Sequence, residues 1–255
     1  MSELFIKILN MSISASWIVF AILFLRFFVK KAPRWIMVFM WGVVGIRLIC
    51  PFSFESALSL IPSANTVSPE IMLDKSPQIN SGIPVINNFV NPIISESFAP
   101  QPLASANPLQ ILIPVFSILW IAGITIMLVY AIVSYLLIKL KTKTAIKLYD
   151  NIYQSEFVNS PFVLGIFKPK IYLPFIITDC AVDYVISHEN AHIARKDYLW
   201  KPIGYLLLSI YWFNPFMWVA YIMLCRDIEL ACDEKVVKEF ETQAISFISQ
   251  GIQVP

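Results

Sequence analysis

Charged residues are scarce in this 255-residue chain. Asp, Glu, Lys and Arg together make up 14% of it, whereas hydrophobic residues make up 58% and the mean hydropathy is +0.70. A soluble domain is roughly half apolar, so this chain has too little polar surface to cover a globule of its size in water. The composition therefore predicts a membrane protein in contact with lipid. The net charge of +2 is too small to indicate direct binding of nucleic acid.

Cysteine is also scarce, and histidine more so. The four cysteines form no C-x-x-C pair and no regular framework, which disfavours both a disulfide scaffold and a thiolate zinc knuckle. We expect them to be free, partly buried thiols. The two histidines both lie in HENAH, residues 188–192, so any chemistry that requires imidazole is confined to that segment.

Three apolar segments are candidates for membrane-spanning helices. Residues 8–25 and 109–138 carry no charge and are long enough to cross a bilayer. Residues 35–50 are a weaker candidate, because the side chain of Arg47 would have to reach the headgroups. A fourth charge-free run covers residues 202–225.

Lysine and arginine counts in the connecting segments predict the orientation of a multi-pass protein in the cell membrane. Four basic residues and no acid lie between the first two spans, and four lysines follow the third span. The segment between has one lysine and four acids. We therefore expect the N-terminus and an irregular loop over about 54–107 to be outside. Residues 1–140 are then the transmembrane region, and residues 141–255 form a domain that begins in the cytoplasm.

Residues 146–176 differ from the spans. Runs of β-branched and aromatic residues, interrupted by Asn-Ser-Pro, Gly and Lys-Pro, predict two or three short strands. A helix is expected to follow, from Thr178 or Asp179 to about Arg195, and HENAH lies inside it.

HENAH has the spacing of a zinc-binding helix. His188 and His192 are four residues apart and so lie on one face, where both imidazoles can bind one ion. Glu189 points elsewhere and is placed to take a proton from water on the metal. H-E-x-x-H also occurs by chance, and a polar helix near a membrane surface would explain it without a metal. The absence of other histidines favours a site with Zn²⁺ as cofactor.

The third ligand is expected in RDIELACDE, residues 226–234. Glu229 would complete the His-His-Glu set used by catalytic zinc sites. Asp233, one helical turn later, is expected to accept a hydrogen bond from a ligand histidine and orient its ring. A solvated acidic face is the alternative. Cys232 would suit a structural zinc site, but we interpret it as a neighbour of the ligands.

His188 and Glu229 can share one ion only if residues 202–225 return to the side of the membrane from which they start. Asn214-Pro215 offers a break, because proline lacks a backbone donor and the residue before it avoids helical geometry. We expect a bent, membrane-associated helix pair over about 203–226, with halves 203–213 and 216–226, that keeps Glu229 in the cytoplasm.

Four segments together resemble the BlaR/MecR-type membrane metallopeptidases, the antirepressor peptidases of Gram-positive β-lactam signalling. They are SPFVLGIFKPKIYLP (160–174), HENAHIARKDYLW (188–200), WFNP (212–215) and ELACDE (229–234). The resemblance covers about residues 140–240. It implies zinc bound by His188, His192 and Glu229, with Glu189 as the general base. The expected fold class is a mainly α membrane protein with about three transmembrane helices and a cytoplasmic α+β zincin domain, gluzincin-like, with a small sheet.

The sequence departs from well-known members of that family. Those continue into a further span and an extracellular penicillin-binding sensor with a serine nucleophile, and nothing here resembles its S-x-x-K motif. The resemblance therefore implies a short form or a fragment, and β-lactam sensing is not carried over. Asp197 also matches the family pattern, but an ordinary surface acid explains it equally well, so we leave it outside the catalytic set.

The function we expect is a zinc endopeptidase that cleaves a protein or peptide substrate at the cytoplasmic face, by analogy a transcriptional repressor or signalling partner. An extended substrate could pair with the strand at 163–173. The alternatives are a non-hydrolytic membrane signal transducer that retains the zinc fold, and a membrane zincin of the HtpX or CAAX-protease type. Membrane lipid is an expected partner, and a homo-oligomer remains open. The transition-state donor is unassigned among Tyr198, Tyr205 and Tyr211.

Overall fold

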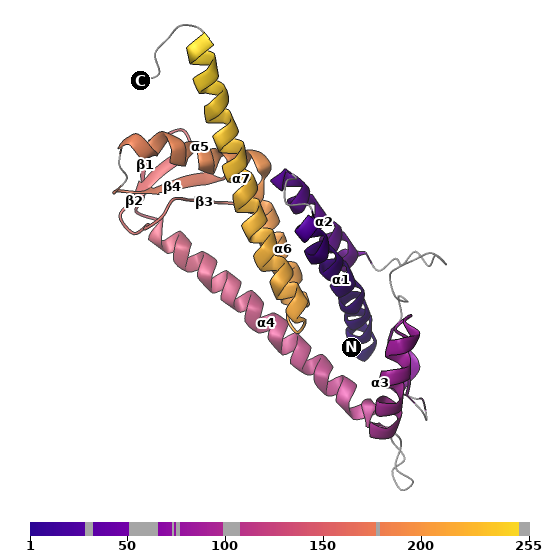
Figure 1. Cartoon of the computed structure of the whole chain (residues 1–255). Helices are drawn as coiled ribbons and strands as arrows, with labels where there is room; N and C mark the ends of the chain where they lie inside the picture. Colours follow the sequence, from indigo (N-terminus) through magenta and orange to yellow (C-terminus); the bar gives the residue numbers. More distant parts are fainter. Residues whose placement is uncertain are drawn as a thin grey trace. The chain divides into compact units, whose positions relative to one another are not determined.

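The computed structural model describes residues 1–28, 33–50, 66–72, 74, 77–98, 108–176 and 179–249. These residues are mainly helical, with one small mixed sheet (Figure 1). The chain divides into two compact units. Unit 1 comprises Met1–Lys30, Met40–Met127 and Leu207–Ala220, and unit 2 comprises Lys31–Phe39, Leu128–Leu206 and Tyr221–Pro255.

Two of the described helices are long and apolar enough to cross a membrane. They are α1 (Ser2–Phe28), with 27 residues, and α4 (Leu109–Lys141), with 33. At 1.5 Å per residue they are about 40 and 50 Å long, against a hydrocarbon core of about 30 Å. Helix α2 (Arg34–Ile49) has 16 residues, or about 24 Å, so the third span expected over 35–50 is not confirmed.

Helix α4 exposes large apolar side chains along most of its length, among them Ile118, Ile126, Val133 and Leu140. A continuous apolar surface of this kind in water would promote association, whereas lipid tails accommodate it without cost. The exposure pattern therefore supports the membrane assignment independently of the hydropathy.

The segment between the spans is partly helical. Residues 54–65, 73, 75–76 and 99–107 lie outside the described residues, but the remainder contains the short 3-10 helix η1 (Pro69–Met72) and helix α3 (Pro84–Ser97). The expectation of an irregular loop is therefore wrong for these residues. Pro84 explains part of the difference, because proline is favoured in the first turn of a helix. In unit 1, the side-chain amide of Asn10 exchanges two hydrogen bonds with the Val67 backbone, at 2.8 and 2.9 Å.

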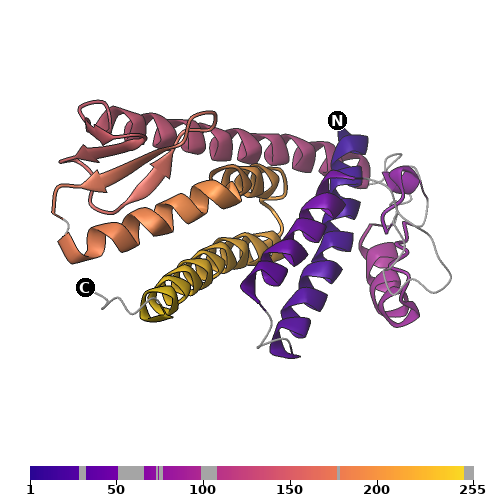
Figure 2. The same cartoon turned by 90° about the horizontal axis from the view of Figure 1, so that it is seen from above.

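Helices α6 (Asp197–Ile210) and α7 (Pro215–Ser249) form a hairpin whose turn covers residues 211–214 (Figures 1 and 2). The chain reverses at Asn214-Pro215, where the sequence predicts a break. The side-chain oxygen of Asn214 accepts a hydrogen bond from the Phe216 amide at 2.9 Å, and its amide nitrogen donates to the hydroxyls of Ser12 and Ser16 at 2.6 and 2.7 Å. The turn is thus held to α1 within unit 1. Helix α7 has 35 residues, so the expected short second half, 216–226, is wrong.

Unit 2 contains a four-stranded sheet rather than the two or three strands expected. The strands are β1 (Ile146–Tyr149), β2 (Ile152–Ser155), β3 (Phe162–Leu164) and β4 (Lys170–Pro174), in the order β1-β2-β4-β3. The β2–β4 pair is parallel and the other two pairs are antiparallel. Strand β3 is therefore at an edge. Gly165 allows the turn that follows β3, because its φ of 117° is strained for any residue with a Cβ.

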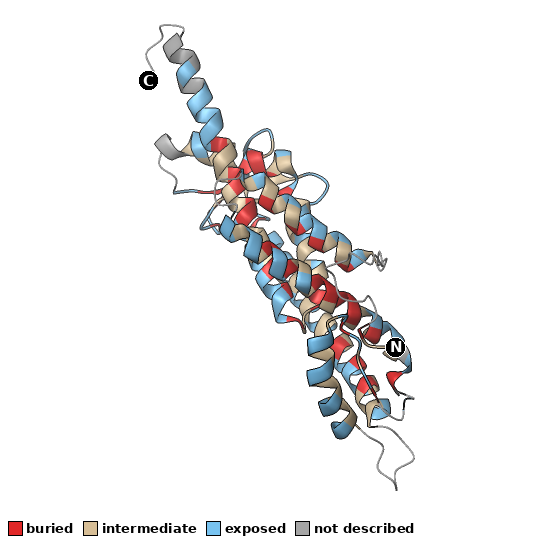
Figure 3. Ribbon diagram, turned by 45° about the vertical axis from the view of Figure 1, so that its right-hand side comes forward, coloured by how far each residue is buried: buried red, intermediate tan, exposed pale blue. Residues whose placement is uncertain are grey.

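Helix α5 (Asp179–Arg195) packs on this sheet. Its residues Val185, Ile186 and Ile193 contact the buried side chains of Ile152, Ile171 and Leu173. On α5, Ala191 also forms a buried cluster with Cys232 and Val236 of α7. Beyond these residues α7 is exposed over residues 237–242 (Figure 3). The core of unit 2 thus holds α5 between the sheet and α7, and α5 carries HENAH.

Candidate metal centre

His188 and His192 point to the same place from one face of α5, as their spacing predicts. Their Nε2 atoms lie 3.1 Å apart, and the two rings are nearly perpendicular with centroids 4.8 Å apart. His192 is buried and His188 is partly exposed. The two imidazoles therefore present a pair of nitrogen ligands toward a single point.

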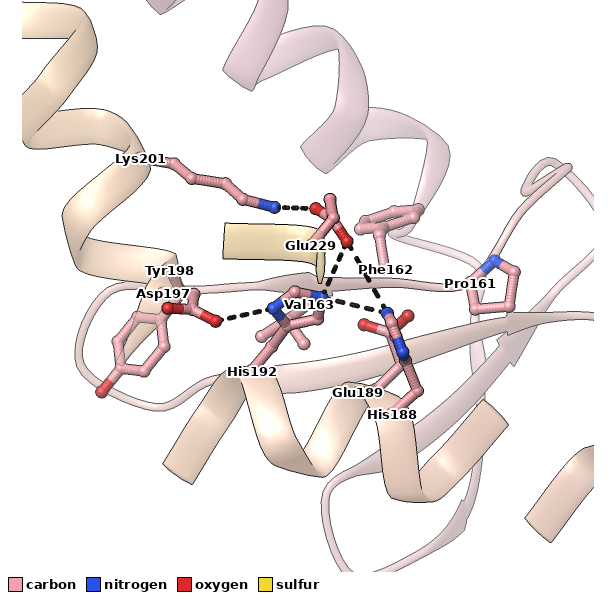
Figure 4. Close-up of a pocket in the computed structure, with 10 residues that line it drawn as sticks. All are labelled: Pro161, Phe162, Val163, His188, Glu189, His192, Asp197, Tyr198, Lys201 and Glu229. Atoms are coloured by element: carbon pink, nitrogen blue, oxygen red, sulfur yellow. Dashed lines mark hydrogen bonds and ion pairs between the residues drawn. The ribbon is translucent and has the colours of Figure 1, made fainter. Parts of the chain in front are cut away.

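Glu229 joins this pair from α7. Its Oε2 lies 3.2 Å from Nε2 of His192 and 3.7 Å from Nε2 of His188 (Figure 4). In tetrahedral zinc with ligand bonds of roughly 2.0–2.2 Å, neighbouring ligand atoms are about 3.3 Å apart. The three observed separations are close to that value. The donor set of two nitrogens and one carboxylate oxygen therefore fits zinc.

Cys232 is also near the two histidines. Its Sγ and one nitrogen of each ring lie within 4.8 Å of one another. The thiol is fully buried, however, and donates a hydrogen bond to the backbone carbonyl of His188 at 3.3 Å. Cys232 is thereby held to the α5 backbone in the core between α5 and α7, and its interpretation as a neighbour of the ligands stays a prediction.

Each histidine has a carboxylate at its other ring nitrogen. Asp233 Oδ1 lies 3.2 Å from Nδ1 of His188, in the supporting position that the sequence predicts. Asp197 Oδ2 lies 2.8 Å from Nδ1 of His192 and 3.4 Å from Nε of Arg195. The Asp197 side chain is 3% exposed, against 49% for Asp233. Asp197 is therefore the more strongly held of the two, and the alternative of an ordinary surface acid is wrong for it.

The short connection between α5 and α6 explains the position of Asp197. Lys196 has a φ of 61°, in the left-handed region that non-glycine residues seldom adopt. This interrupts the helix at one residue, so that α6 begins at Asp197, and the Asp197 carboxylate contacts His192. In the sequence, the match of Asp197 to the family pattern was the signal for its role. Helical periodicity does not predict the break at Lys196.

Charges around the site shift its pKa values. Burial alone would lower the pKa of His192, but hydrogen bonds with Asp197, Cys232 and Glu229 raise it to about 11. Hydrogen bonds from His192 and Lys201 together lower the pKa of Glu229 to about 2, against the effect of burial. The site thus holds Glu229 as a carboxylate, which is the form that binds metal.

Glu189 lies beside the ligands and is 7% exposed. Burial raises its pKa above the ordinary value, and the nearby histidines and Lys201 only partly offset that effect. A carboxylate with a raised pKa is a better proton acceptor near neutral pH than an ordinary glutamate. Its position and its pKa both suit a general base.

Five of these residues line one cavity of about 380 Å³ (Figure 4): His188, Glu189, His192, Asp197 and Glu229. Its remaining walls are Pro161, Phe162 and Val163 at strand β3, and Tyr198 and Lys201 from α6. Lys201 was missed by the sequence analysis, because an isolated lysine in an apolar helix has no motif. Of the three tyrosines considered as donors, only Tyr198 lines this cavity.

Comparison with known proteins places the chain in a family. The family model for BlaR1 peptidase M56 matches residues 6–245. Regulatory protein BlaR1 of Bacillus licheniformis is 30% identical over 150 residues, which cover 49% of this chain and 25% of the relative. The methicillin resistance mecR1 protein of Staphylococcus aureus is 31% identical over 88 residues, 33% of this chain and 15% of the relative. The matches thus span a quarter or less of these relatives' length. Because the family model covers nearly the whole sequence, the chain belongs to the BlaR1 peptidase M56 family.

Proposed function

We propose that this chain is a zinc-dependent endopeptidase with a gluzincin-type site, which cleaves a protein at the cytoplasmic face of the membrane. The observation that carries the proposal is the convergence of His188, His192 and Glu229 from two helices beside a buried glutamate. Membership of the M56 family supports peptidase activity.

In this proposal His188, His192 and Glu229 hold zinc, which when bound polarises the substrate carbonyl and lowers the pKa of water. Glu189 takes a proton from the attacking water and delivers it to the leaving amine. Asp197 and Asp233 each accept a hydrogen bond from the distal nitrogen of a histidine and so fix the orientation of the ring.

Strand β3 offers a place for the substrate backbone. Among the described strands, β3 pairs only with β4, and its residues Phe162 and Val163 line the cavity. An extended peptide added to this edge would lie across the site. The segment expected to pair with the substrate was 163–173. Of this segment we propose only the part in β3, because β4 already pairs with β2 and β3 and cannot accept a further strand.

The substrate we propose is a protein of a regulatory system, since the B. licheniformis relative is named a regulatory protein. A transcriptional repressor and a membrane signalling partner are the two candidates. A homo-oligomer of this chain would be compatible with either substrate.

The test compares cells that express the wild-type chain with cells that express Glu189→Ala, and measures new protein N-termini across the proteome. Loss of the general base is expected to slow cleavage by about 10²–10⁴-fold. Zinc content of the purified protein, measured by mass spectrometry, should be unchanged. If cleavage persists in Glu189→Ala with zinc still bound, the chain is a transducer that retains the metal, and the peptidase proposal fails.

A further inference from the structure

Lys201 brings a cation to the candidate metal centre. Its Nζ lies 2.5 Å from Oε1 of Glu229, whereas Oε2 of the same carboxylate faces the two histidines. The side chain extends from α6 into the cavity, where it is 34% exposed (Figure 4). The ammonium group is thus within the cavity and accessible to a ligand there.

A lysine at this position is electrostatically unfavourable for metal binding. Zn²⁺ on Oε2 and an ammonium on Oε1 would repel each other across one carboxylate, in a partly buried site where the effective dielectric constant is low. A glutamine would hold Glu229 by a hydrogen bond without that repulsion. A positive charge at this position can, however, attract an anion in the cavity, which a glutamine would do less strongly.

The other charged groups in the cavity do not offer such a contribution. Glu189, Asp197 and Glu229 are acids, and the two histidines face the candidate metal position. Of the ten described residues that line the cavity, Lys201 is the one lysine or arginine. The Lys201 side chain is therefore the charged donor available to an anion that forms in the cavity.

The three tyrosines considered in the sequence analysis as transition-state donors are placed less well than Lys201 to donate to an anion in the cavity. The hydroxyl of Tyr198 points away from the histidines (Figure 4). Tyr205 packs against Tyr221, with ring centroids 6.0 Å apart, and Tyr211 lies in unit 1 and donates to the Leu48 carbonyl at 2.7 Å.

We propose that Lys201 is a catalytic residue that donates a hydrogen bond to the oxyanion formed from the substrate carbonyl. This inference rests on the proposed peptidase function. Water adds to the carbonyl carbon while the C=O π pair moves to oxygen, and Glu189 takes the water proton. Collapse of the tetrahedral adduct breaks the C–N bond, and Glu189 returns the proton to the amine. No oxidant or reductant takes part, and Lys201 stabilises the charge on oxygen between the two steps.

The inference can be tested without knowing the substrate. Phenylphosphonate, a tetrahedral anion, serves as the oxyanion probe, and imidazole serves as a neutral probe of the metal. Both are titrated into the full-length protein loaded with Co²⁺, and binding is followed by the visible spectrum. Zinc affinity is measured separately by competition with a chelator. The variants are Lys201→Met and Lys201→Arg, with Lys238→Met as a control, because Lys238 is an exposed lysine of α7 outside the cavity.

Lys201→Met should weaken phenylphosphonate binding by about 10-fold or more, the value expected for loss of a hydrogen bond from a charged donor. Imidazole binding should be unchanged, and zinc affinity should be unchanged or higher. Lys201→Arg should retain most of the phosphonate binding, which also shows that the site folds with a different cation. Lys238→Met should match wild type.

Two results would overturn the inference. If zinc affinity falls by about 10–100-fold in Lys201→Met, the lysine only holds Glu229 in position. If phenylphosphonate binding is unaffected, or if the wild-type protein binds neither metal nor probe, Lys201 is not an anion donor. Failure of the proposed function is recognised separately, by proteolysis that persists in Glu189→Ala.

Discussion

Asp197 and Asp233 occupy equivalent positions on the two histidines but differ greatly in exposure. Asp197 is almost completely buried and also contacts Arg195, whereas half of the Asp233 side chain is exposed. A charged hydrogen bond is stronger where water is excluded. We therefore expect His192 to depend on its carboxylate more than His188 does.

Asp197→Asn should lower zinc affinity by about 10–100-fold, because the amide no longer provides the negative charge that orients and polarises His192. Asp233→Asn is the matched control, and its effect should be several-fold smaller. Competition with a chelator at fixed pH measures both. If both variants lose zinc affinity to the same extent, the burial of a carboxylate does not determine how strongly it supports its histidine.

These residues show which parts of the site the sequence predicts. The common face of His188 and His192 follows from helical periodicity, which places residues four apart on one face. Glu229 was instead expected from the His-His-Glu set of catalytic zinc sites and from the family resemblance. Asp197 and Lys201 belong to a helix whose direction is set by one left-handed residue, Lys196. Such a change of helix direction is a property of the tertiary fold, so no spacing in the sequence assigns these two side chains to the site.

At the scale of elements, the turn between α6 and α7 packs tightly in unit 1. The Trp212 indole donates to the Trp120 carbonyl of α4 at 3.2 Å and covers Gly123 one turn later. A Cβ at Gly123 would overlap the indole ring. Glycine is therefore required at position 123 because the Trp212 indole leaves no room for a Cβ, and not because of a special backbone conformation.

Gly123→Ala should destabilise the protein by about 1–3 kcal/mol, as overpacking does, although alanine favours a helix. Gly42→Ala in α2 is the control, because a Cβ there meets no atom within 4 Å. Its expected effect is neutral or slightly stabilising. Unfolding by SDS titration in one detergent measures both, and a Gly123→Ala variant as stable as Gly42→Ala would show that Trp212 moves aside freely.

The hairpin also shows how far helix boundaries can be predicted. Asn214-Pro215 fixes the start of α7, since proline suits the first helical position and Asn214 accepts the Phe216 amide. The expected end at residue 226 followed the end of the charge-free run 202–225, but α7 continues to Ser249. No glycine or proline occurs between residues 216 and 249, so the helix continues into the polar region that carries Glu229.

At the scale of the whole molecule, the composition predicts a membrane protein, and the two long apolar helices agree with it. The number of spans was less predictable, because residues 35–50 and 202–225 are both apolar runs but differ in structure. One forms a helix of 16 residues and the other is divided by a turn. A high hydropathy indicates that a segment avoids water, but it does not distinguish a membrane-spanning helix from a helical hairpin.

The orientation leads to a prediction about sides of the membrane. The lysines after α4 predict that unit 2 residues such as Lys143 lie in the cytoplasm. The contact of Glu229 with His192 then requires this part of α7 to lie on the same side. Single cysteines are introduced at Lys143, at Glu239 of α7 and at Glu96 of α3, in a chain whose four native cysteines are replaced. A membrane-impermeant maleimide should label only position 96 in intact cells, and positions 143 and 239 only after lysis.

Labelling at 239 in intact cells, with 143 protected, would mean that the hairpin crosses the bilayer once. His188 and Glu229 would then lie on opposite faces and could not bind one ion. The reverse result, labelling of 143 and 239 together in intact cells, would keep the metal centre but invert the protein. The lysine counts would then have failed to predict orientation, and the substrate would have to be sought outside the cytoplasm.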